Sequence, residues 1–229
     1  MFMTKPRHEI KVFINYSDYL SIKNRLKHFA TLDKNAGNDG VYHIRSLYFD
    51  NYSDKALMEK INGFNNREKF RIRFYNNDPS FIKLEKKSKS NGLCYKSSAS
   101  LTKEDSEKIL NGGIEFLKDS NKDVLKEFYC KLKYQCLKPK TIVDYTREAY
   151  IFKAGNVRIT IDSNLKSGLY STNIFDANLP TLGLINENPI ILEIKYDNFL
   201  PDIIRDLIQT NIRSQTAVSK YAACRLFTV

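Results

Sequence analysis

Apolar and polar residues alternate along several short segments of this chain, and residues 69–74 show the pattern most clearly. Successive side chains of a β-strand point to opposite faces. A strand here would present Lys69, Arg71 and Arg73 on one face and three apolar side chains on the other. The segment therefore predicts a sheet with one cationic face and one buried face.

The same period of two recurs along the chain and predicts further strands. They lie at residues 7–14, 41–50, 81–87, 94–98, 140–152, 157–162 and 189–196, with strand potential also near 169–174. Residues 76–79 and the pair Gly155-Asn156 predict hairpin turns, and residues 88–92 read as a flexible polar loop. So many strands with one charged face suggest a closed sheet with a charged interior.

Apolar residues at helical spacing predict helices between these strands. They cover about 18–32, 53–61, 102–111, 123–136, 201–212 and 214–226. Ser17 or Asp18 is the expected N-cap of the first helix, and Thr102 with Asp105 resembles a capping box. The apolar stripe of the first helix is expected to pack on the outer wall of the sheet.

The bulk properties favour one domain, residues 1–229, without an internal repeat or a linker. No window approaches the roughly 18 apolar residues of a membrane span, and the N-terminus has no apolar signal region. The four cysteines show neither zinc spacing nor a dense disulfide framework, and are expected to be reduced. We therefore expect a cytoplasmic protein with no membrane span in this chain.

The net charge of +11 points to a phosphate-rich ligand, nucleic acid or an anionic surface. Inside a closed sheet, two like charges about 6 Å apart repel by roughly 3 kcal/mol at an effective dielectric of about 20. The cationic array is therefore expected to hold anions, interleaved carboxylates or both. Glu9, Glu85 and Glu193 interrupt it, and are candidate ligands of Mg²⁺ or Mn²⁺, which bind through carboxylates and substrate phosphates.

The sequence pattern also allows interpretations without a phosphate-binding lumen. The charges could form the solvent-facing side of an antiparallel sheet. The aromatic residues could stack on nucleic-acid bases, although most fall on apolar faces. The three histidines have no ligand spacing, and neither a P-loop nor a dinucleotide fingerprint is present.

Eight motifs in order resemble the VTC (vacuolar transporter chaperone) domain, the polyphosphate polymerase branch of the triphosphate tunnel metalloenzymes (CYTH-like proteins). The motifs are Arg7-x-Glu9-x-Lys11, Ser46-Leu47-Tyr48-Phe49-Asp50, Lys69-Phe70-Arg71-Ile72-Arg73-Phe74-Tyr75, Leu84-Glu85-Lys86-Lys87, Tyr145-x-Arg147, Val157-Arg158-Ile159-Thr160-Ile161-Asp162, Leu192-Glu193-Ile194-Lys195 and Ser219-Lys220-Tyr221. The resemblance implies an α+β fold: an antiparallel β-barrel tunnel of about eight strands, with a basic lumen and helices packed around it.

The resemblance also implies a metal-dependent phosphotransferase. It would transfer the γ-phosphate of ATP, or of another triphosphate, to a growing polyphosphate chain with Mn²⁺ or Mg²⁺ as cofactor, and would bind no nucleic acid. Glu193 would be the metal ligand, with Glu85 and Glu9 as further candidates. Carried over by position, the phosphate-binding residues would be Lys11, Lys60, Arg71, Arg73, Lys87, Lys96, Tyr145, Arg147, Arg158, Ser219 and Lys220. The expected catalytic residues among them are Arg71, Arg73, Lys87 and Lys220.

Two positions depart from the related patterns. Arg7 replaces the first acid of the E-x-E-x-K strand of the hydrolytic relatives, which favours the polymerase. Lys60 stands where the polymerases have Arg, so it keeps the charge and loses the planar fork. Nothing in the family pattern requires Lys69. The alternatives are an inorganic or nucleoside triphosphatase of the same fold and a non-enzymatic polyphosphate or nucleotide binder.

Overall fold

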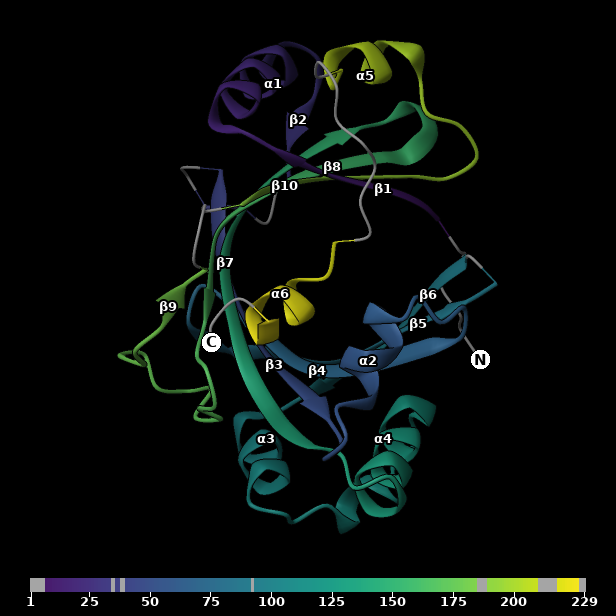
Figure 1. Cartoon of the computed structure of the whole chain (residues 1–229), viewed down its shortest axis with the longest axis vertical. Helices are drawn as coiled ribbons and strands as arrows, with labels where there is room; N and C mark the ends of the chain where they lie inside the picture. The colour runs from purple at the N-terminus through teal and green to yellow at the C-terminus, as the bar shows by residue number, and fades with distance from the viewer. Residues whose placement is uncertain are drawn as a thin grey trace.

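Eight antiparallel strands curl into a half-barrel in the computed structural model, which describes residues 7–33, 36–37, 40–91, 93–184, 189–209 and 218–226. Figure 1 shows the curled sheet with helices above, below and within it. In spatial order the strands are β1 (His8–Ile14), β10 (Ile190–Tyr196), β8 (Val157–Ser167), β7 (Lys138–Phe152), β3 (Val41–Asp50), β4 (Arg67–Tyr75), β5 (Asp78–Ser90) and β6 (Leu93–Leu101). Two short strands, β2 (Thr31–Leu32) and β9 (Leu182–Gly183), pair with β7 and β8.

The predicted fold class is confirmed, with one difference in how the sheet ends. β1 and β6 are the two edges, and within the described residues neither pairs with the other. The sheet is therefore curled but not closed by backbone hydrogen bonds. An alternating sequence specifies which side chains face inward, and this pattern is the same for a curled sheet and a closed barrel.

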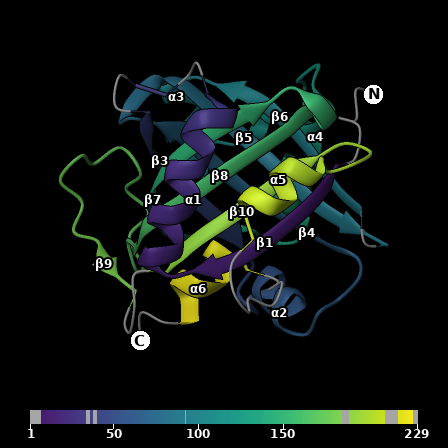
Figure 2. The ribbon, with the colours of Figure 1, turned by 90° about the horizontal axis from the view of Figure 1, so that it is seen from above.

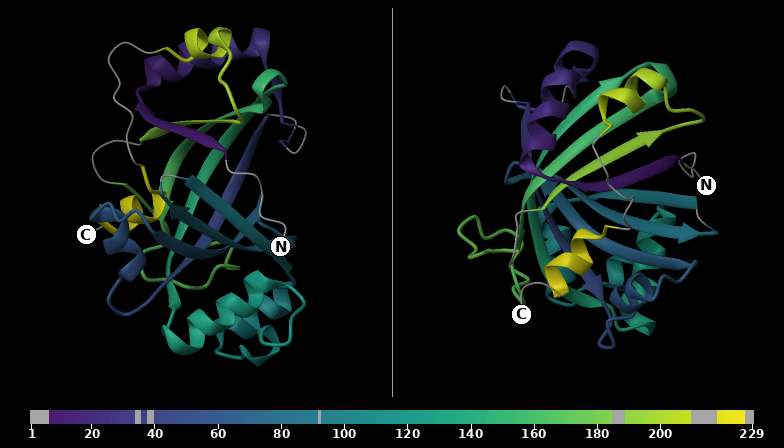
Figure 3. Two further views of the ribbon diagram at one scale, coloured as in Figure 1. Left: turned by 90° about the vertical axis from the view of Figure 1, so that its right-hand side faces the viewer. Right: turned by 45° about the horizontal axis from the view of Figure 1, so that its top comes forward.

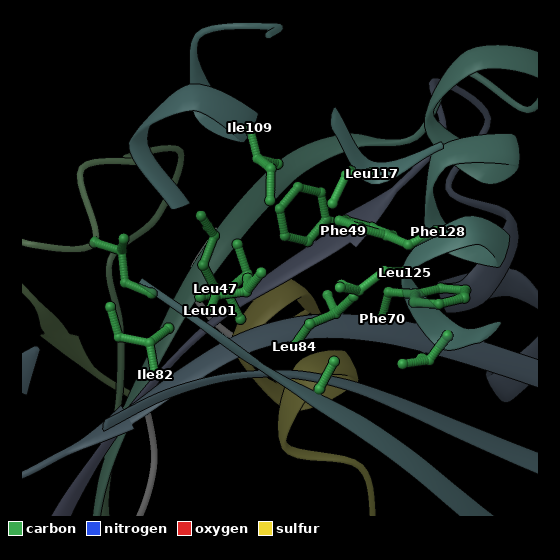
Figure 4. Packing of buried hydrophobic residues seen from close by; sticks show 14 of the residues in the cluster. Leu47, Phe49, Phe70, Ile82, Leu84, Leu101, Ile109, Leu117, Leu125 and Phe128 are labelled. Carbon is green, nitrogen blue, oxygen red and sulfur yellow. The ribbon is translucent and has the colours of Figure 1, made fainter. Parts of the chain in front are cut away.

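Two pairs of helices cover the outer, apolar face of the sheet. α1 (Tyr16–Phe29) and α5 (Asp202–Leu207) lie over β1, β8 and β10, where Ile22 and Leu26 pack against Leu192 and its neighbours (Figure 2). α3 (Lys103–Leu110) and α4 (Asp123–Tyr134) lie over β3 to β6, and Phe128 packs between Phe49 and Phe70 (Figure 4). The inner face is thereby left to the charged residues.

The remaining two helices lie near the inner face. α6 (Lys220–Leu226) sits inside the curl (Figure 3), where Tyr221 stacks on Tyr48 with 5.1 Å between ring centroids. The Tyr221 hydroxyl donates to the Asp50 carboxylate at 2.8 Å, and the same carboxylate accepts from the backbone N–H of Ala56 at 2.9 Å at the start of α2 (Lys55–Ile61). Asp50 thus connects α2 and α6, and α6 carries Lys220 into the lumen. Two 3₁₀ turns, Glu115–Leu117 and Ala154–Asn156, complete the described elements.

Several predicted boundaries were wrong. Asn15, not Ser17 or Asp18, caps α1, because its side chain accepts from the backbone of Asp18, whose carboxylate closes the capping box. Residues 88–90, predicted as part of a flexible polar loop, belong to β5 and pair with β6. Residues 169–174 form no strand, and β8 extends to Ser167 instead. The predicted helix boundaries within 210–217 lie outside the described residues.

Candidate active site

The inner face encloses a cavity of about 790 Å³ whose walls are dominated by cations. Strands from both halves of the sheet, α2 and the residues preceding α6 contribute to it. The basic side chains that line it are Arg7, Lys11, Lys60, Arg67, Lys69, Lys87, Lys89, Lys96, Arg147, Arg158 and Lys195. The alternation in the sequence therefore converges on one basic lumen.

Charged side chains face each other across β4 and β5 in a ladder of four rungs. Arg73 pairs with Lys83, Arg71 with Glu85, Lys69 with Lys87, and Arg67 with Lys89. The first two rungs lie behind the cavity lining and the last two line it. The ladder therefore runs from a buried end to an open end.

Glu85 is the counter-ion of the buried end of the ladder. Its carboxylate lies 2.8 Å from Nε and 2.6 Å from Nη2 of Arg71, 3.6 Å from Nη1 of Arg73, and 2.5 Å from Nζ of Lys96. Burial alone would raise the pKa of Glu85, but these three cations hold it well below its usual range. Glu85 thus offsets one of the three positive charges of these predicted phosphate ligands in the free protein. Arg71 uses two of its five N–H donors to bind it.

Tyrosines complete the buried end. The hydroxyl of Tyr48 accepts from Arg71 at 2.7 Å, and that of Tyr145 accepts from Arg73 at 2.8 Å. Burial opposes ionisation of Tyr48, yet Arg71, Lys69 and Arg73 lower its pKa to about 8. The structure therefore places Tyr145 among the predicted cations, where it orients Arg73.

Asp162 holds two further predicted residues together. Its carboxylate lies 2.5 and 2.7 Å from Nε and Nη2 of Arg147, and 2.6 Å from Nζ of Lys220. Burial raises the pKa of Asp162, but Arg147 and Lys220 outweigh burial and lower it to about 2. Asp162 was not predicted as a site residue, although its alternation with Arg158 and Thr160 along β8 placed it on the cationic face.

Glu9 and Glu193 come together on neighbouring strands at the other wall of the cavity. Lys11 forms an ion pair with Glu9 and lies 3.8 Å from Glu193, whose second oxygen is 2.6 Å from Lys195. Burial raises the pKa of Glu193 and of Glu9, but Lys11, Lys87 and Lys195 lower both values. Both carboxylates are therefore ionised and adjacent.

This wall fits a hard divalent cation better than the Glu85 position does. The buried hydroxyl of Thr160, which lines the cavity directly across from Glu193, has no hydrogen-bond partner within the described residues. Two carboxylates and a free hydroxyl suit Mg²⁺ or Mn²⁺, which take oxygen ligands and keep several waters. The described residues hold no group of three acidic, histidine or cysteine side chains, so substrate oxygens and water would supply the other ligands.

The remaining predicted residues lie around the same cavity. Arg158 donates to Asp33 at 2.6 Å and to the Tyr42 hydroxyl at 2.8 Å, while Lys60 lines the lumen from α2. Ser219 also lines it and accepts from Lys69 at 3.3 Å. Eight of the fourteen predicted site residues therefore line the cavity itself. The other six are not among its lining residues: Arg71, Arg73, Glu85, Tyr145, Glu193 and Lys220.

Five basic residues outside the predicted set also line the cavity: Arg7, Arg67, Lys69, Lys89 and Lys195. Lys69 was expected to be dispensable, and Lys195, although part of a family motif and of the cationic face, was not predicted to bind phosphate. The sequence pattern that identified the predicted site residues also applies to Lys69 and Lys195, because each alternates with a predicted site residue on the same strand. Arg45 on β3 is also cationic but does not belong to the lumen, because it lies on the outer face and binds Asp144 at 2.8 Å.

Comparisons with known proteins agree with this fold. The model of the VTC domain matches residues 6–229, whereas no curated protein matches the chain significantly. A candidate adenylate cyclase from Bacillus halodurans is similar in structure, with a TM-score of 0.56, 10% identity, and coverage of 93% of this chain and 95% of that one. A candidate adenylyl cyclase from Hippeastrum, described as having a dominant triphosphatase activity, has a TM-score of 0.57, 13% identity, and coverage of 97% and 98%.

Proposed function

This chain belongs to the VTC domain family, and from that premise we propose that it is a metal-dependent polyphosphate polymerase. The observation that carries the proposal is the lumen itself, where cations from both halves of the sheet surround one cavity beside the Glu9 and Glu193 carboxylates. The ligand of such a lumen must carry several negative charges in a compact chain. A nucleoside triphosphate and a polyphosphate chain both do.

In the proposed reaction, a terminal oxygen of the polyphosphate chain attacks the γ-phosphorus of ATP. The bond from that phosphorus to the β–γ bridging oxygen breaks, so the chain grows by one phosphate and ADP leaves. Lys87, Arg147 and Arg158 line the cavity and would bind the phosphate oxygens. Because this type of transfer needs mainly positioning and charge neutralisation, an array of fixed cations is suited to it.

Glu193 and Glu9 would hold the divalent cation, which would supply neutralisation of the charge that develops on the transferred phosphate. Lys11 and Lys195 hold both carboxylates in place and ionised. We propose that Glu85 orients cations instead, because its oxygens already contact Arg71, Arg73 and Lys96. Phosphates bound nearby would compete with Glu85 for those three side chains.

The purified chain should convert ATP to ADP and a long anionic polymer when Mn²⁺ or Mg²⁺ is added. Lys87→Met should lose this activity. Lys83→Met is the matched control on the same strand and face, since Lys83 lies against the Phe81 ring and does not line the cavity. Polymer formation that fails in the wild-type chain would contradict the proposal.

A triphosphatase is the second candidate, favoured by the activity described for the Hippeastrum relative. It would transfer the phosphate to water, so ADP and orthophosphate would form without polymer. Comparing the two phosphate products in the same assay separates the candidates. A chain that binds tripolyphosphate and turns nothing over would be a binding module.

A further inference from the structure

Two consecutive rungs of the β4–β5 ladder consist only of cations. Lys69 lies opposite Lys87, and Arg67 lies opposite Lys89. Directly opposed residues of an antiparallel pair have Cβ atoms only about 5 Å apart, and like charges there destabilise the sheet. Two such rungs in sequence are a local cost to the fold, which usually marks a functional site.

Among the described residues none of these four side chains forms an ion pair, although Glu193 and Glu9 act on Lys87 from farther away. Elsewhere in the lumen each pair of cations has a carboxylate: Glu85 for Arg71 and Arg73, and Asp162 for Arg147 and Lys220. No carboxylate among the described residues lies within 4 Å of the charged atoms of Arg67, Lys69, Lys87 or Lys89. Glu68, between Arg67 and Lys69, also lines the cavity, but Lys86 and Lys131 bind its carboxylate.

The contacts of Lys69 show what this lack of compensation does. Its ammonium group lies 3.3 Å from the Ser219 hydroxyl and 5.5 Å from the centre of the Tyr48 ring. Burial together with Arg71, Lys11 and Lys220 lowers its pKa to about 8, although Tyr48 acts in the opposite direction. The lysine is held in a strongly positive field.

A fifth cation lies at the open end of the ladder. Lys60 comes from α2, which contacts β4, and it lines the same cavity. Burial, Arg67, Lys11 and Lys89 all lower its pKa. The uncompensated positive charge is thus continuous from Lys69 to the edge of the cavity beside α2.

We propose that Arg67, Lys69 and Lys89 form a binding track for a condensed phosphate chain longer than a triphosphate. The track deepens the proposed function and rests on it. From Arg71 to Arg67 the strand advances about 13 Å, which extends the row of cations beyond the buried end of the ladder. None of the four rung residues is aromatic, but Tyr95 and Tyr221 line the same cavity. Because single-stranded nucleic acid is bound through aromatic stacking as well, an oligonucleotide is compared directly in the test.

Metal-free binding measurements on the full chain test the track. Wild-type protein, Arg67→Gln and the control Lys83→Gln would be titrated with tripolyphosphate and with a longer linear polyphosphate at one salt concentration. We expect wild type and the control to bind the longer chain more tightly. Arg67→Gln should lose about tenfold in affinity for the longer chain and less than about twofold for tripolyphosphate.

Lys69→Met adds a readout that a purely structural role would not give. It should raise the melting temperature of the free protein, because it removes repulsion, and should weaken binding of both anions. An Arg67→Gln chain with an unchanged preference for long polyphosphate would overturn the track alone. Wild-type protein that binds neither anion would overturn both the track and the proposed function. A single-stranded oligonucleotide bound as tightly as polyphosphate, with the same loss in Arg67→Gln, would overturn the assignment to phosphate chains.

Discussion

The Nζ atom of Lys220 lies 2.6 Å from the carboxylate of Asp162. This contact joins α6 to β8 inside the lumen, and Arg147 binds the same carboxylate. Two predicted phosphate ligands are therefore held in position by one acid, which offsets one of their two positive charges. Any phosphate that enters their neighbourhood competes with Asp162.

Asp162→Asn should destabilise the free protein and make it respond more strongly to substrate. Removing one partner of a buried ion pair costs about 3–5 kcal/mol, because it leaves uncompensated charge. Tripolyphosphate should recover more stability in Asp162→Asn than it adds to wild type. Urea unfolding with and without tripolyphosphate measures both effects.

Asp144→Asn is the matched control for this experiment. Asp144 binds the buried Arg45 on the outer face, away from the cavity. Its loss should also destabilise the protein, but the gain from tripolyphosphate should equal that of wild type. Equal gains in the two variants would argue against Asp162 as the counter-ion of a phosphate site.

Glu193→Gln should separate metal use from phosphate binding. Loss of a metal ligand should reduce activity by more than the roughly 10- to 100-fold typical of a residue that only supports a ligand. Metal-free binding of tripolyphosphate should hold or strengthen, because a negative charge leaves the lumen. Activity measured across Mn²⁺ concentrations, with Glu127→Gln as the outer-face control, tests this. An unaltered Mn²⁺ dependence in Glu193→Gln would remove Glu193 from the metal site.

Tripolyphosphate should raise the melting temperature of the wild-type chain. At a hundred times its dissociation constant a ligand stabilises the folded state by about 2.7 kcal/mol. For a chain of this size the expected shift is roughly 5 to 10 °C. Differential scanning calorimetry checks it, with sodium sulfate at matched ionic strength as the control. The absence of any shift would contradict a lumen lined by these cations.

The free protein should become more stable as the pH rises from about 8 to about 10. The pKa of Lys69 is about 8 in the folded state and near 10.4 in an unfolded chain. Between these values the unfolded state binds more protons, so stability increases with pH. Lys11, whose pKa is raised, loses stability only above this window, whereas Cys224, whose pKa burial raises to about 12, opposes the rise from about pH 9 upward. Tyr48, also near 8, adds to the rise.

Lys69→Met should flatten this pH dependence. Chemical unfolding of both proteins across the window gives the difference attributable to Lys69. Arg71, Lys220 and Lys11 face Lys69 from β4, α6 and β1, and the raised pKa values of Arg71 and Lys11 keep these two charged throughout the window. Parallel pH profiles for the two proteins would show that Lys69 is fully charged in the free lumen.

The inward faces of the strands could be predicted from the sequence because alternation depends only on local geometry. Phe70 and Ile72 alternate with Arg71 and Arg73, and the structure buries the first pair under α4 and turns the second pair inward. The hairpin from β5 to β6 was harder. Polar residues near its turn look like a loop, but their backbone groups are paired across the strands.

Counter-ions were the part of the site that local pattern could not reveal. Glu85 alternates with lysines just as Glu193 does, so the sequence made both metal candidates. Register decides between them: β4 places Arg71 directly opposite Glu85, whereas β8 places Thr160 opposite Glu193. Asp162 was missed for the same reason, since its partner Lys220 reaches it only after α6 folds into the curl.

β1 and β6, the edges of the sheet, do not pair with each other within the described residues, so a bound substrate could connect them. Lys11 on β1 and Lys96 on β6 both line the cavity from these edges. In an ordinary barrel, strand number and stagger fix the diameter. Here a phosphate chain bound to Lys11 and Lys96 would connect β1 and β6 electrostatically. The length of the bound chain would then determine how close together these two edge strands lie. Backbone amides of β1 and β6 should then exchange hydrogen more slowly as the polymer grows.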